Sequence, residues 1–503
     1  MSRLEEQLRL QRMENRLIEA LVDARAPLPP EREGLLRYAL SLARLETFQP
    51  GAAREGERIE RPDVTIRSEA HGKFRRLVLA RLAGPLLSEL TPRRRLRAAD
   101  EAIHFFQDRL SEAREDILRN HANDFSRDEL DDEISIKSLV NVGGGGGGAG
   151  YVYVGAYDVL QNAGIIPRFL MGSSIGAMLG LFRAKTRWAD LDEYIALGNR
   201  LRPEEVFRVI SMKANYGLPG VFRLFLHSGL GPTFRHPTGE SYTLADLEIP
   251  FEPIVAGIRR GSVGAEFDEY AKTHHLPGDK RPGPLELRAQ LASQVVRLVG
   301  FANPRVVKEI VLGADELTRE FDAIDAAGFS AAVPGILHYD IARKDYRMRA
   351  ICGELLRRED VVALVDGGLA NNVPAKTAWR RVREGRIGTR NAYILAFDCF
   401  HPQLSPGHIA LHPLEAVIQL QVALNRRYWN RKINFTPTLS PMSVLPSPRK
   451  LNRAIEWGRS TMLVHLPYVA KALEPITFRP DHRIQTTASG RYKRLSSILP
   501  PPA

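Results

Sequence analysis

Cysteine is scarce in this chain of 503 residues: Cys352 and Cys399 are the only two, each inside a mainly hydrophobic stretch. A disulfide framework is therefore not expected, and a reducing compartment is predicted. No run approaches the roughly 18 consecutive apolar residues of a membrane-spanning helix. The first residues, MSRLEEQLRLQRMENRLIEALVDAR, alternate leucines with charges and lack the apolar segment of a signal peptide. These absences predict a cytoplasmic protein whose contact with membranes is peripheral.

Motifs of nucleic-acid-binding proteins are also absent. The sequence has no zinc-finger spacing, no aromatic RNP-type motif and no recognition-helix signature. Its net charge of +12 is spread thinly, with three local clusters: PRRRLR from Pro92, RRYWNRK from Arg426 and RYKR from Arg491. Such clusters are commonly solvated helix faces or tails, and the alternative is contact with anionic lipid headgroups. We expect no nucleic acid partner and retain an anionic membrane surface as a candidate.

Composition and periodicity divide the chain into three parts. Hydrophobic residues at 44% and charged residues at 26% are ordinary for a folded globular protein. Residues 1–133 place apolar side chains at helical spacing, with prolines between the helices, and carry no catalytic signal. They predict an all-helical region with a structural or docking role. Residues 134–400 are expected to form the catalytic domain, and residues 401–503 a helical extension and tail that pack on it.

Strands and helices alternate from residue 134 onward. ISIKSLVNV predicts a strand, YVYVGAYDVLQNAG a helix, IIPRFLMG a strand and GAMLGLFRAK a helix. FEPIVAGI, VVALVD and AYILAFDCF are further strand candidates. Strand–helix–strand units of this length imply parallel pairing. The predicted fold class is therefore α/β, with a mainly parallel central sheet covered by helices on both faces.

The sharpest chemical signal is GSSIG, which fits Gly-x-Ser-x-Gly with Ser174 at its centre. A predicted strand enters the motif and a helix of small residues leaves it, the context that a nucleophile elbow requires. Gly172 and Gly176 remove the side chains that would block so sharp a turn. We predict that Ser174 is a nucleophile held at the N-terminal end of a helix, where backbone donors favour developing negative charge.

A serine hydroxyl needs a base, and the segment VVALVDGGLANNVP supplies a candidate. Asp366 ends an apolar strand and is followed by Gly367 and Gly368, so its carboxylate is expected at the same sheet edge as Ser174. An Asp-Gly turn without catalytic function is the simpler interpretation of this segment taken alone. In combination with Ser174 and the glycine run, the catalytic interpretation is favoured.

Six consecutive glycines at 143–148 follow the first predicted strand. Their backbone N–H groups can approach a tetrahedral oxyanion because no side chain intervenes. A linker does not lie between a strand and a helix, and a P-loop would need Gly-Lys-Ser/Thr after it. A dinucleotide loop needs an acidic residue at the end of the next strand, where the chain has Met171-Gly172. We therefore predict an oxyanion loop.

These motifs, in this order, resemble the patatin-like phospholipases, which use a Ser-Asp dyad without histidine. FDAIDAAGFSAAVPGILHYD looks like the family's segment with Ala-x-Pro, DGGLANNVP like its Asp-Gly-Gly segment, and LADLEIPFEPIVAGI like its strand entering the sheet. The likeness covers residues 134–400. It implies a patatin-like three-layer sandwich without cofactor or metal, with Ser174 and Asp366 catalytic and Gly145, Gly146 and Gly147 donating to the oxyanion.

The resemblance also implies a substrate class. It implies hydrolysis of acyl esters in phospholipids, lysophospholipids or neutral acylglycerols, which sequence spacing does not separate, with the lipid presented at a membrane or micelle surface. We favour phospholipids or lysophospholipids as the substrate. One position departs from the family: Ala149 stands where the glycine loop usually has Arg or Lys. Loss of that cation would weaken loop anchoring or headgroup attraction.

Two alternatives stay open at the level of sequence. A Ser-His-Asp hydrolase would place His401 or His408 after Asp366 in the right chain order, although no His-Gly-Gly oxyanion motif accompanies them. A catalytically weak scaffold or regulatory protein would keep the fold and act through its helical N-terminal region. Ala149 favours that second alternative, and the intact Ser174 and Asp366 argue against it.

Overall fold

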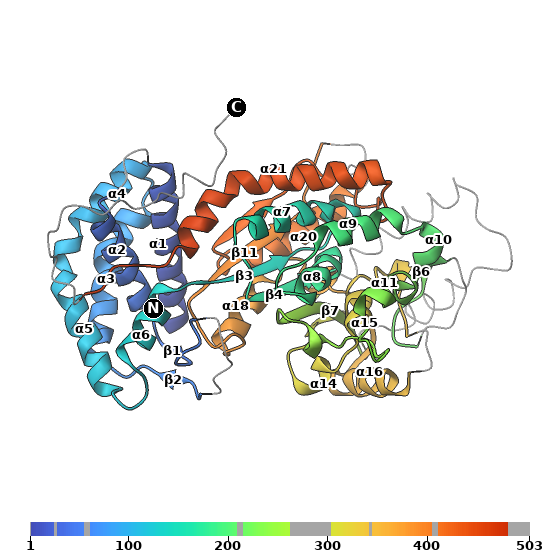
Figure 1. Cartoon of the computed structure of the whole chain (residues 1–503), viewed down its shortest axis with the longest axis horizontal. Coiled ribbons are helices and arrows are strands. Elements are labelled where there is room, and N and C mark those ends of the chain that lie inside the picture. The colour runs from blue at the N-terminus through green and yellow to red at the C-terminus, as the bar shows by residue number, and fades with distance from the viewer. Residues whose placement is uncertain are drawn as a thin grey trace.

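The structure is a computed structural model that describes residues 2–24, 28–54, 61–208, 215–261, 303–341, 345–404 and 411–480. His408 and the cluster from Arg491 lie outside the described residues. The N-terminal region forms one end of the molecule in Figure 1, drawn in blue to cyan. Its helices are α1 (Arg3–Asp23), α2 (Pro30–Arg44), α3 (Glu69–Leu87), α4 (Pro92–Glu101), α5 (Gln107–Asn120) and α6 (Arg127–Ser135).

The N-terminal region also contains a short antiparallel pair, β1 (Thr47–Phe48) with β2 (Val64–Thr65). Helices α1 and α6 begin with capping boxes, in which Ser2 pairs with Glu5 and Ser126 with Glu129. Each capping box satisfies backbone N–H groups that a helix start leaves unpaired. Within the described ranges, no helix combines the length and the apolar character needed to cross a bilayer.

The central sheet has seven strands: pairing runs β12-β11-β3-β4-β7, and β7 pairs further along the β4 edge with β10 and on its other edge with β8. Strands β7, β4, β3, β11 and β12 are mutually parallel, whereas β8 and β10 run antiparallel to β7. The bounds are β3 (Ser138–Gly143), β4 (Phe169–Ser173), β7 (Phe251–Arg259), β8 (Val307–Val311), β10 (Val361–Asp366), β11 (Ala392–Asp398) and β12 (Arg431–Asn434). The expected mainly parallel sheet is confirmed.

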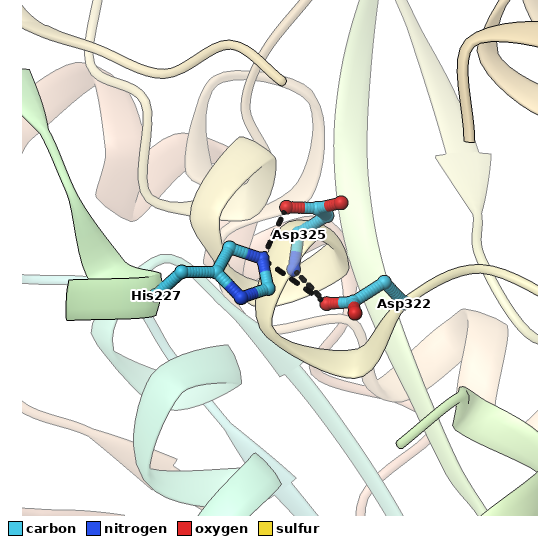
Figure 2. Close-up of side chains that lie close together, drawn as sticks. All are labelled: His227, Asp322 and Asp325. Carbon is cyan, nitrogen blue, oxygen red and sulfur yellow. Dashed lines mark hydrogen bonds and ion pairs between the residues drawn. The ribbon is translucent and has the colours of Figure 1, made fainter. Parts of the chain in front are cut away.

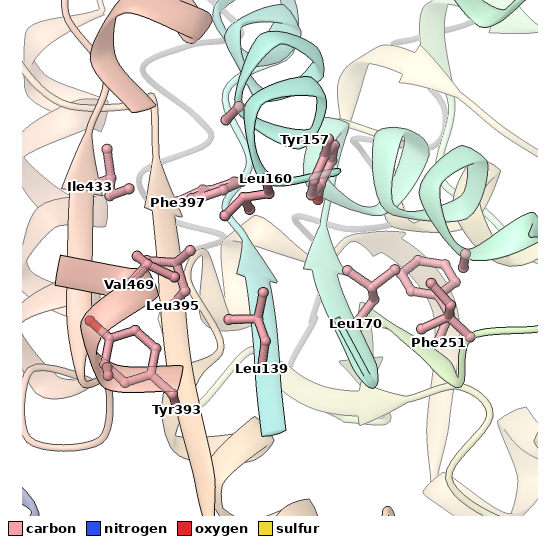
Figure 3. Packing of buried hydrophobic residues seen from close by; sticks show 14 of the residues in the cluster. Leu139, Tyr157, Leu160, Leu170, Phe251, Tyr393, Leu395, Phe397, Ile433 and Val469 are labelled. Atoms are coloured by element: carbon pink, nitrogen blue, oxygen red, sulfur yellow. The ribbon is translucent and has the colours of Figure 1, made fainter. Parts of the chain in front are cut away.

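Both faces of the sheet are covered, which makes the fold a three-layer α/β sandwich. Alternate residues of each strand enter two different cores: Leu139 and Leu395 belong to one, Val140 and Ile394 to the other. The first core is shown in Figure 3, where Leu139, Leu170 and Leu395 project from neighbouring strands beneath Tyr157 and Leu160 of a covering helix. Because both faces are buried, the strands are nearly continuous hydrophobic runs.

The covering helices are contributed by the whole chain. The first core is covered by α7 (Val152–Asn162), α8 (Ile175–Lys185) and α21 (Pro448–Leu473), and extends into the N-terminal helices. The second core is covered by α17 (Gly368–Asn371), α18 (Ala375–Arg383) and α20 (His412–Leu424). In Figure 1, α21 runs along the top of the molecule from above α9 (Leu191–Arg200) toward α1.

Smaller elements complete the described part of the fold. Strands β5 (Phe207–Arg208), β6 (Gly220–Leu224) and β9 (Gly335–His338) form a separate small sheet. The neighbouring helices are α10 (Pro203–Val206), α11 (Leu226–Leu230), α14 (Glu316–Arg319), α15 (Ala323–Ser330) and α16 (Tyr346–Glu359), with the 3₁₀ turn η2 (Gly147–Tyr151) before α7.

Candidate active site

Ser174 occupies a strained turn between β4 and α8. Its φ of 54° and ψ of −125° lie in a region that residues with a Cβ rarely adopt. The turn is possible because its neighbours are glycines: a Cβ on Gly172 would lie 2.4 Å from the Gly176 carbonyl oxygen, and one on Gly176 would lie 2.3 Å from that of Gly143. The sequence therefore holds the Ser174 hydroxyl at the first turn of α8, where the helix dipole favours negative charge.

Asp366 lies at the end of β10, which runs along β7 in the direction opposite to β4. Strands β4 and β10 lie on the same side of β7, because β8 occupies the other side. The parallel strand β4 ends with Ser173 opposite Ile254, and the antiparallel strand β10 ends with Asp366 opposite Val255. The two strands thus meet end to end along consecutive residues of β7, which brings the two side chains together.

Ser330, at the end of α15, connects both candidate catalytic residues. Its Oγ accepts a hydrogen bond from Ser174 N at 3.0 Å and donates one to the Ile254 carbonyl at 2.5 Å. Its carbonyl accepts from Gly367 N at 3.0 Å, while Asp366 N donates to the Ala332 carbonyl at 2.8 Å. All of these groups are buried, so the segment at 330–332 fixes the backbone of Ser174 and Asp366 relative to each other.

The Asp366 carboxyl group is suited to the role of a base. Burial raises its pKa to about 6, against the opposing effects of the Ser174 hydroxyl and the Gly368 N–H, which both favour the carboxylate. The Gly368 N–H donates to Asp366 Oδ1 at 2.8 Å. Asp366 is therefore ionised at neutral pH yet basic enough to accept a proton from Ser174.

Some backbone N–H groups of the glycine loop are already hydrogen-bonded within the protein, and others are available to an oxyanion. Gly144 N donates to the Phe397 carbonyl at 2.9 Å, and Gly145 N donates to Asn372 Oδ1 at 3.0 Å. The N–H groups of Gly146 and Gly147 have no hydrogen-bond partner within the described residues, and both glycines are half-buried. Of the three predicted oxyanion donors, the structure leaves these two available and commits Gly145 to Asn372.

A segment from the C-terminal part of the chain lies so close to the loop that only glycine fits there. A Cβ on Gly147 would lie 2.3 Å from the Pro441 carbonyl oxygen, and one on Gly148 would lie 2.2 Å from that of Ser443. Gly148 N donates to the same Pro441 carbonyl at 2.9 Å. Only a chain without side chains can lie so close to another backbone. Ala149 is fully buried in η2.

A cavity of about 270 Å³ opens over Ser174 and Asp366, and its walls are apolar. The charged side chains of its lining, within the described residues, are Asp366 and Arg183. Arg183 is buried and donates to the carbonyls of Thr186 and Arg187 at 3.2 Å each. One apolar wall comes from α8 and α9 and the other from the C-terminal part of the chain: Met178, Leu179, Phe182, Leu191 and Leu197, then Leu414, Ile418, Met442, Leu445 and Ile455.

Within the described residues, histidines lie apart from the serine and the aspartate. His401 Nε2 is 3.2 Å from the Phe435 carbonyl oxygen and 3.3 Å from Thr436 Oγ1. His227 of α11 lies 2.8 Å from Asp325 Oδ1 and 3.5 Å from Asp322 Oδ1, as Figure 2 shows. These three groups form a cluster of metal-ligand type, but their hydrogen bonds already join α11, which supplies cavity residues, to the start of α15.

Sequence reasoning missed three contributors to this site. Ser330 and Asn372 lie inside quoted motifs, but each acts through a backbone group more than 150 residues away in the chain. The segment around Pro441 lies outside every motif. The sequence nevertheless contained a sign of this segment. Two oxyanion donors do not need six consecutive glycines, so the extra glycines imply that another backbone lies close to the loop.

Comparison with protein-family models matches residues 142–379 to the family described as patatin-like phospholipase. The matched stretch includes the glycine loop, Ser174, Ser330, Asp366 and Asn372. It ends before the segment around Pro441 and before α20 and α21, which complete the loop and the cavity. No curated protein matches the chain.

Proposed function

The chain carries a patatin-like phospholipase domain over residues 142–379, and from this premise we propose that it hydrolyses acyl esters of phospholipids or lysophospholipids through Ser174 and Asp366. The family supports lipid acyl hydrolysis in general. The observation that carries the finer proposal is the meeting of β4 and β10 along β7, which sets a strained serine beside a buried carboxylate of raised pKa.

The proposed reaction has two steps. Ser174 Oγ attacks the ester carbonyl carbon while its proton passes to Asp366, and the oxyanion that forms receives hydrogen bonds from Gly146 N and Gly147 N. Collapse of this intermediate expels the alcohol, which takes the proton from Asp366, and leaves an acyl-serine. Water then attacks the acyl-serine with Asp366 again accepting a proton, and the departure of the fatty acid returns that proton to Ser174.

The cavity supports a long acyl chain as the buried part of the substrate. Its walls are hydrocarbon, and each methylene moved from water into such a site contributes about 0.8 kcal/mol. The one cationic side chain among the described lining residues is Arg183, whose Nη1 donates to two carbonyl groups and whose buried Nη2 has no partner among them. Because the walls are otherwise apolar, a charged headgroup is best accommodated outside the cavity, at the membrane or micelle surface.

The test is fatty-acid release from phospholipid, lysophospholipid and acylglycerol vesicles. Wild type is compared with Ser174→Ala and Asp366→Asn, each checked for folding by its thermal transition. We expect wild-type release from at least one phospholipid or lysophospholipid, and a loss of about 1000-fold or more in both variants. A wild type that binds vesicles but releases no fatty acid would favour the scaffold alternative.

A second comparison separates the Ser-Asp pair from a Ser-His-Asp hydrolase. His401→Ala and His408→Ala are assayed beside wild type, and both are expected to retain activity. Loss of activity in either histidine variant, with the fold intact, would transfer the role of base from Asp366 to that histidine.

A further inference from the structure

Asn372 is a buried amide that lies where the three parts of the site meet. It follows α17, is 3% exposed and lines the cavity. A Cβ on Gly145 would lie 2.6 Å from Asn372 Oδ1 and 2.9 Å from Ser174 Cβ. A Cβ on Gly368 would lie 2.8 Å from the same amide oxygen and 2.9 Å from Asp366 Oδ1. The amide is therefore a direct neighbour of the glycine loop, the nucleophile and the base.

The orientation of this amide is determined by its hydrogen bond. Gly145 N–H is a donor, so the atom that faces it at 3.0 Å has to be the amide oxygen. The amide nitrogen consequently lies on the other side of the same planar group. Asn372 Nδ2 is buried and has no hydrogen-bond partner within the described residues. A buried donor left without a partner costs about 1–3 kcal/mol, so its retention requires a reason.

We propose that Asn372 is a third oxyanion donor, and that its Nδ2–H group hydrogen-bonds the ester carbonyl oxygen as negative charge develops there. This proposal rests on the proposed function. Gly145 N–H cannot fill the role because it is bonded to Asn372 itself. The oxyanion is then held by Gly146 N, Gly147 N and Asn372 Nδ2, and the unpaired amide finds its partner only in the transition state. Stabilisation of that kind raises kcat without tightening substrate binding.

Asn372→Asp and Asn372→Ala separate donation from loop positioning. The aspartate keeps an oxygen for Gly145 N–H, loses the amide donor and adds a negative charge. Alanine loses the side-chain donor and acceptor together, and leaves Gly145 N only the Asn372 backbone carbonyl, at 3.4 Å. We expect both variants to lower kcat about 100-fold with KM nearly unchanged. The matched control is Asn371→Ala, which removes the neighbouring buried amide that donates to Glu309 Oε2 at 2.9 Å and lies outside the cavity lining. We expect it to lower the melting temperature and to change kcat less than threefold.

A second readout uses a long-chain alkyl trifluoromethyl ketone. Such a ketone adds reversibly to an active-site serine and leaves an oxyanion, whereas the fatty-acid product forms none. We expect the Asn372 variants to bind the ketone weaker by the same factor as their loss of kcat/KM, with product inhibition unchanged. A merely structural role for Asn372 would weaken both ligands alike.

Four outcomes would overturn the proposal. If Asn372→Asp kept the wild-type kcat while Asn372→Ala lost it, the role of Asn372 would be to position Gly145 and not to donate to the oxyanion. Recovery of Asn372→Asp at high pH would mean that its charge acts by raising the pKa of Asp366. Equal activity of wild type and Ser174→Ala would refute the proposed function together with this proposal, whereas an active wild type and unaffected Asn372 variants would refute this proposal alone.

Discussion

Asp366 is a buried carboxyl group whose pKa is raised to about 6, mainly by burial. A general base acts only when ionised, so protonation below this pKa removes activity. We predict that kcat/KM on a water-soluble p-nitrophenyl ester rises about tenfold per pH unit below pH 6 and is constant from about pH 7. An acid limb that moves or disappears in His401→Ala would assign it to that histidine, and a flat profile between pH 5 and pH 8 would contradict the role of Asp366.

The same raised pKa makes a prediction about stability. Because the folded pKa lies above the ordinary value of 3.8, the fold favours neutral Asp366, and stability is lost as pH rises through about 6. An asparagine side chain at this position would mimic the neutral acid and keep the acceptor for Gly368 N. In urea unfolding, Asp366→Asn should match wild type near pH 4 and exceed it by about 3 kcal/mol above pH 7. Ser174→Ala keeps the carboxyl group and should show no such gain; a gain in Asp366→Asn that is independent of pH would contradict the argument.

At this scale, residues within local motifs could be predicted from sequence and residues that act across the chain could not. Ser174 and Asp366 follow from a strand, a turn and small neighbours, all of which are local patterns. The commitment of Gly145 to Asn372 depends on the placement of two loops that are far apart in the chain. The same holds for Ser330, whose hydroxyl in a stretch of small residues carries no sign that it bonds Ser174 N.

Among the elements, α7 and α21 illustrate how the C-terminal part of the chain supports the oxyanion loop. A Cβ on Gly155 of α7 would lie 2.0 Å from the Ile455 carbonyl oxygen, and one on Gly458 of α21 would lie 1.8 Å from that of Val152. The two helices therefore pack backbone to backbone at this crossing. Since α7 begins directly after η2, this crossing contributes to the placement of the glycine loop, together with the hydrogen bonds of the loop itself.

We predict that Gly458→Ala destabilises the protein by about 1–3 kcal/mol and lowers activity, because the added methyl group pushes α21 away from α7. The measurements are the melting temperature and fatty-acid release. The matched control is Gly353→Ala in α16, where no heavy atom lies within 4 Å of an added Cβ. That substitution should be neutral or stabilising by up to about 1 kcal/mol, because alanine is the better helix former. Equal effects of the two substitutions would refute the close crossing.

The elements also show where periodicity was informative and where it was not. Strand positions followed from hydrophobic runs, and the parallel core of the sheet followed from alternating helices. The direction of β10 did not follow, because a fully buried strand has the same composition in either direction. Asp366 was expected at one sheet edge with Ser174, whereas it approaches along β7 from the opposite end. Ser174 and Asp366 were expected to lie close together, and they do so although β10 runs in the direction opposite to β4.

On the scale of the whole molecule, α1 connects the N-terminal region to the rest of the chain by side-chain hydrogen bonds. Gln11 accepts from Trp379 of α18, Asn15 from Asn430, and Asp23 from Tyr468 of α21. The N-terminal helices and the sheet also share one continuous hydrophobic core. The N-terminal region, predicted to be all-helical but found to contain the β1–β2 pair as well, thus contacts the layers that position the site. We expect it to unfold together with them.

The most buried of these connections is the ion pair between Glu14 of α1 and Lys137, the residue before β3. The Lys137 and Glu14 side chains are 8% and 6% exposed, and Arg44 Nη2 lies 3.6 Å from Glu14 Oε2. Burial alone would raise the pKa of Glu14, but the charges of Lys137 and Arg44 lower it to about 2. Removing Glu14 would leave the charges of Lys137 and Arg44 without their carboxylate, whereas removing Lys137 would leave Glu14 beside Arg44.

We therefore predict that Glu14→Leu destabilises the protein by about 3–5 kcal/mol, and that Lys137→Met alone costs less because Arg44 stays beside Glu14. The double variant should be more stable than Glu14→Leu, because the unpaired Lys137 is also removed. Urea unfolding is monitored with two probes: fatty-acid release reports on the catalytic site, and circular dichroism reports on the helices of the whole chain. Because the pair joins two regions that share a core, both signals should change at the same urea concentration in every variant. Loss of N-terminal helix content in Glu14→Leu, with activity retained to higher urea, would show instead that the N-terminal region unfolds on its own.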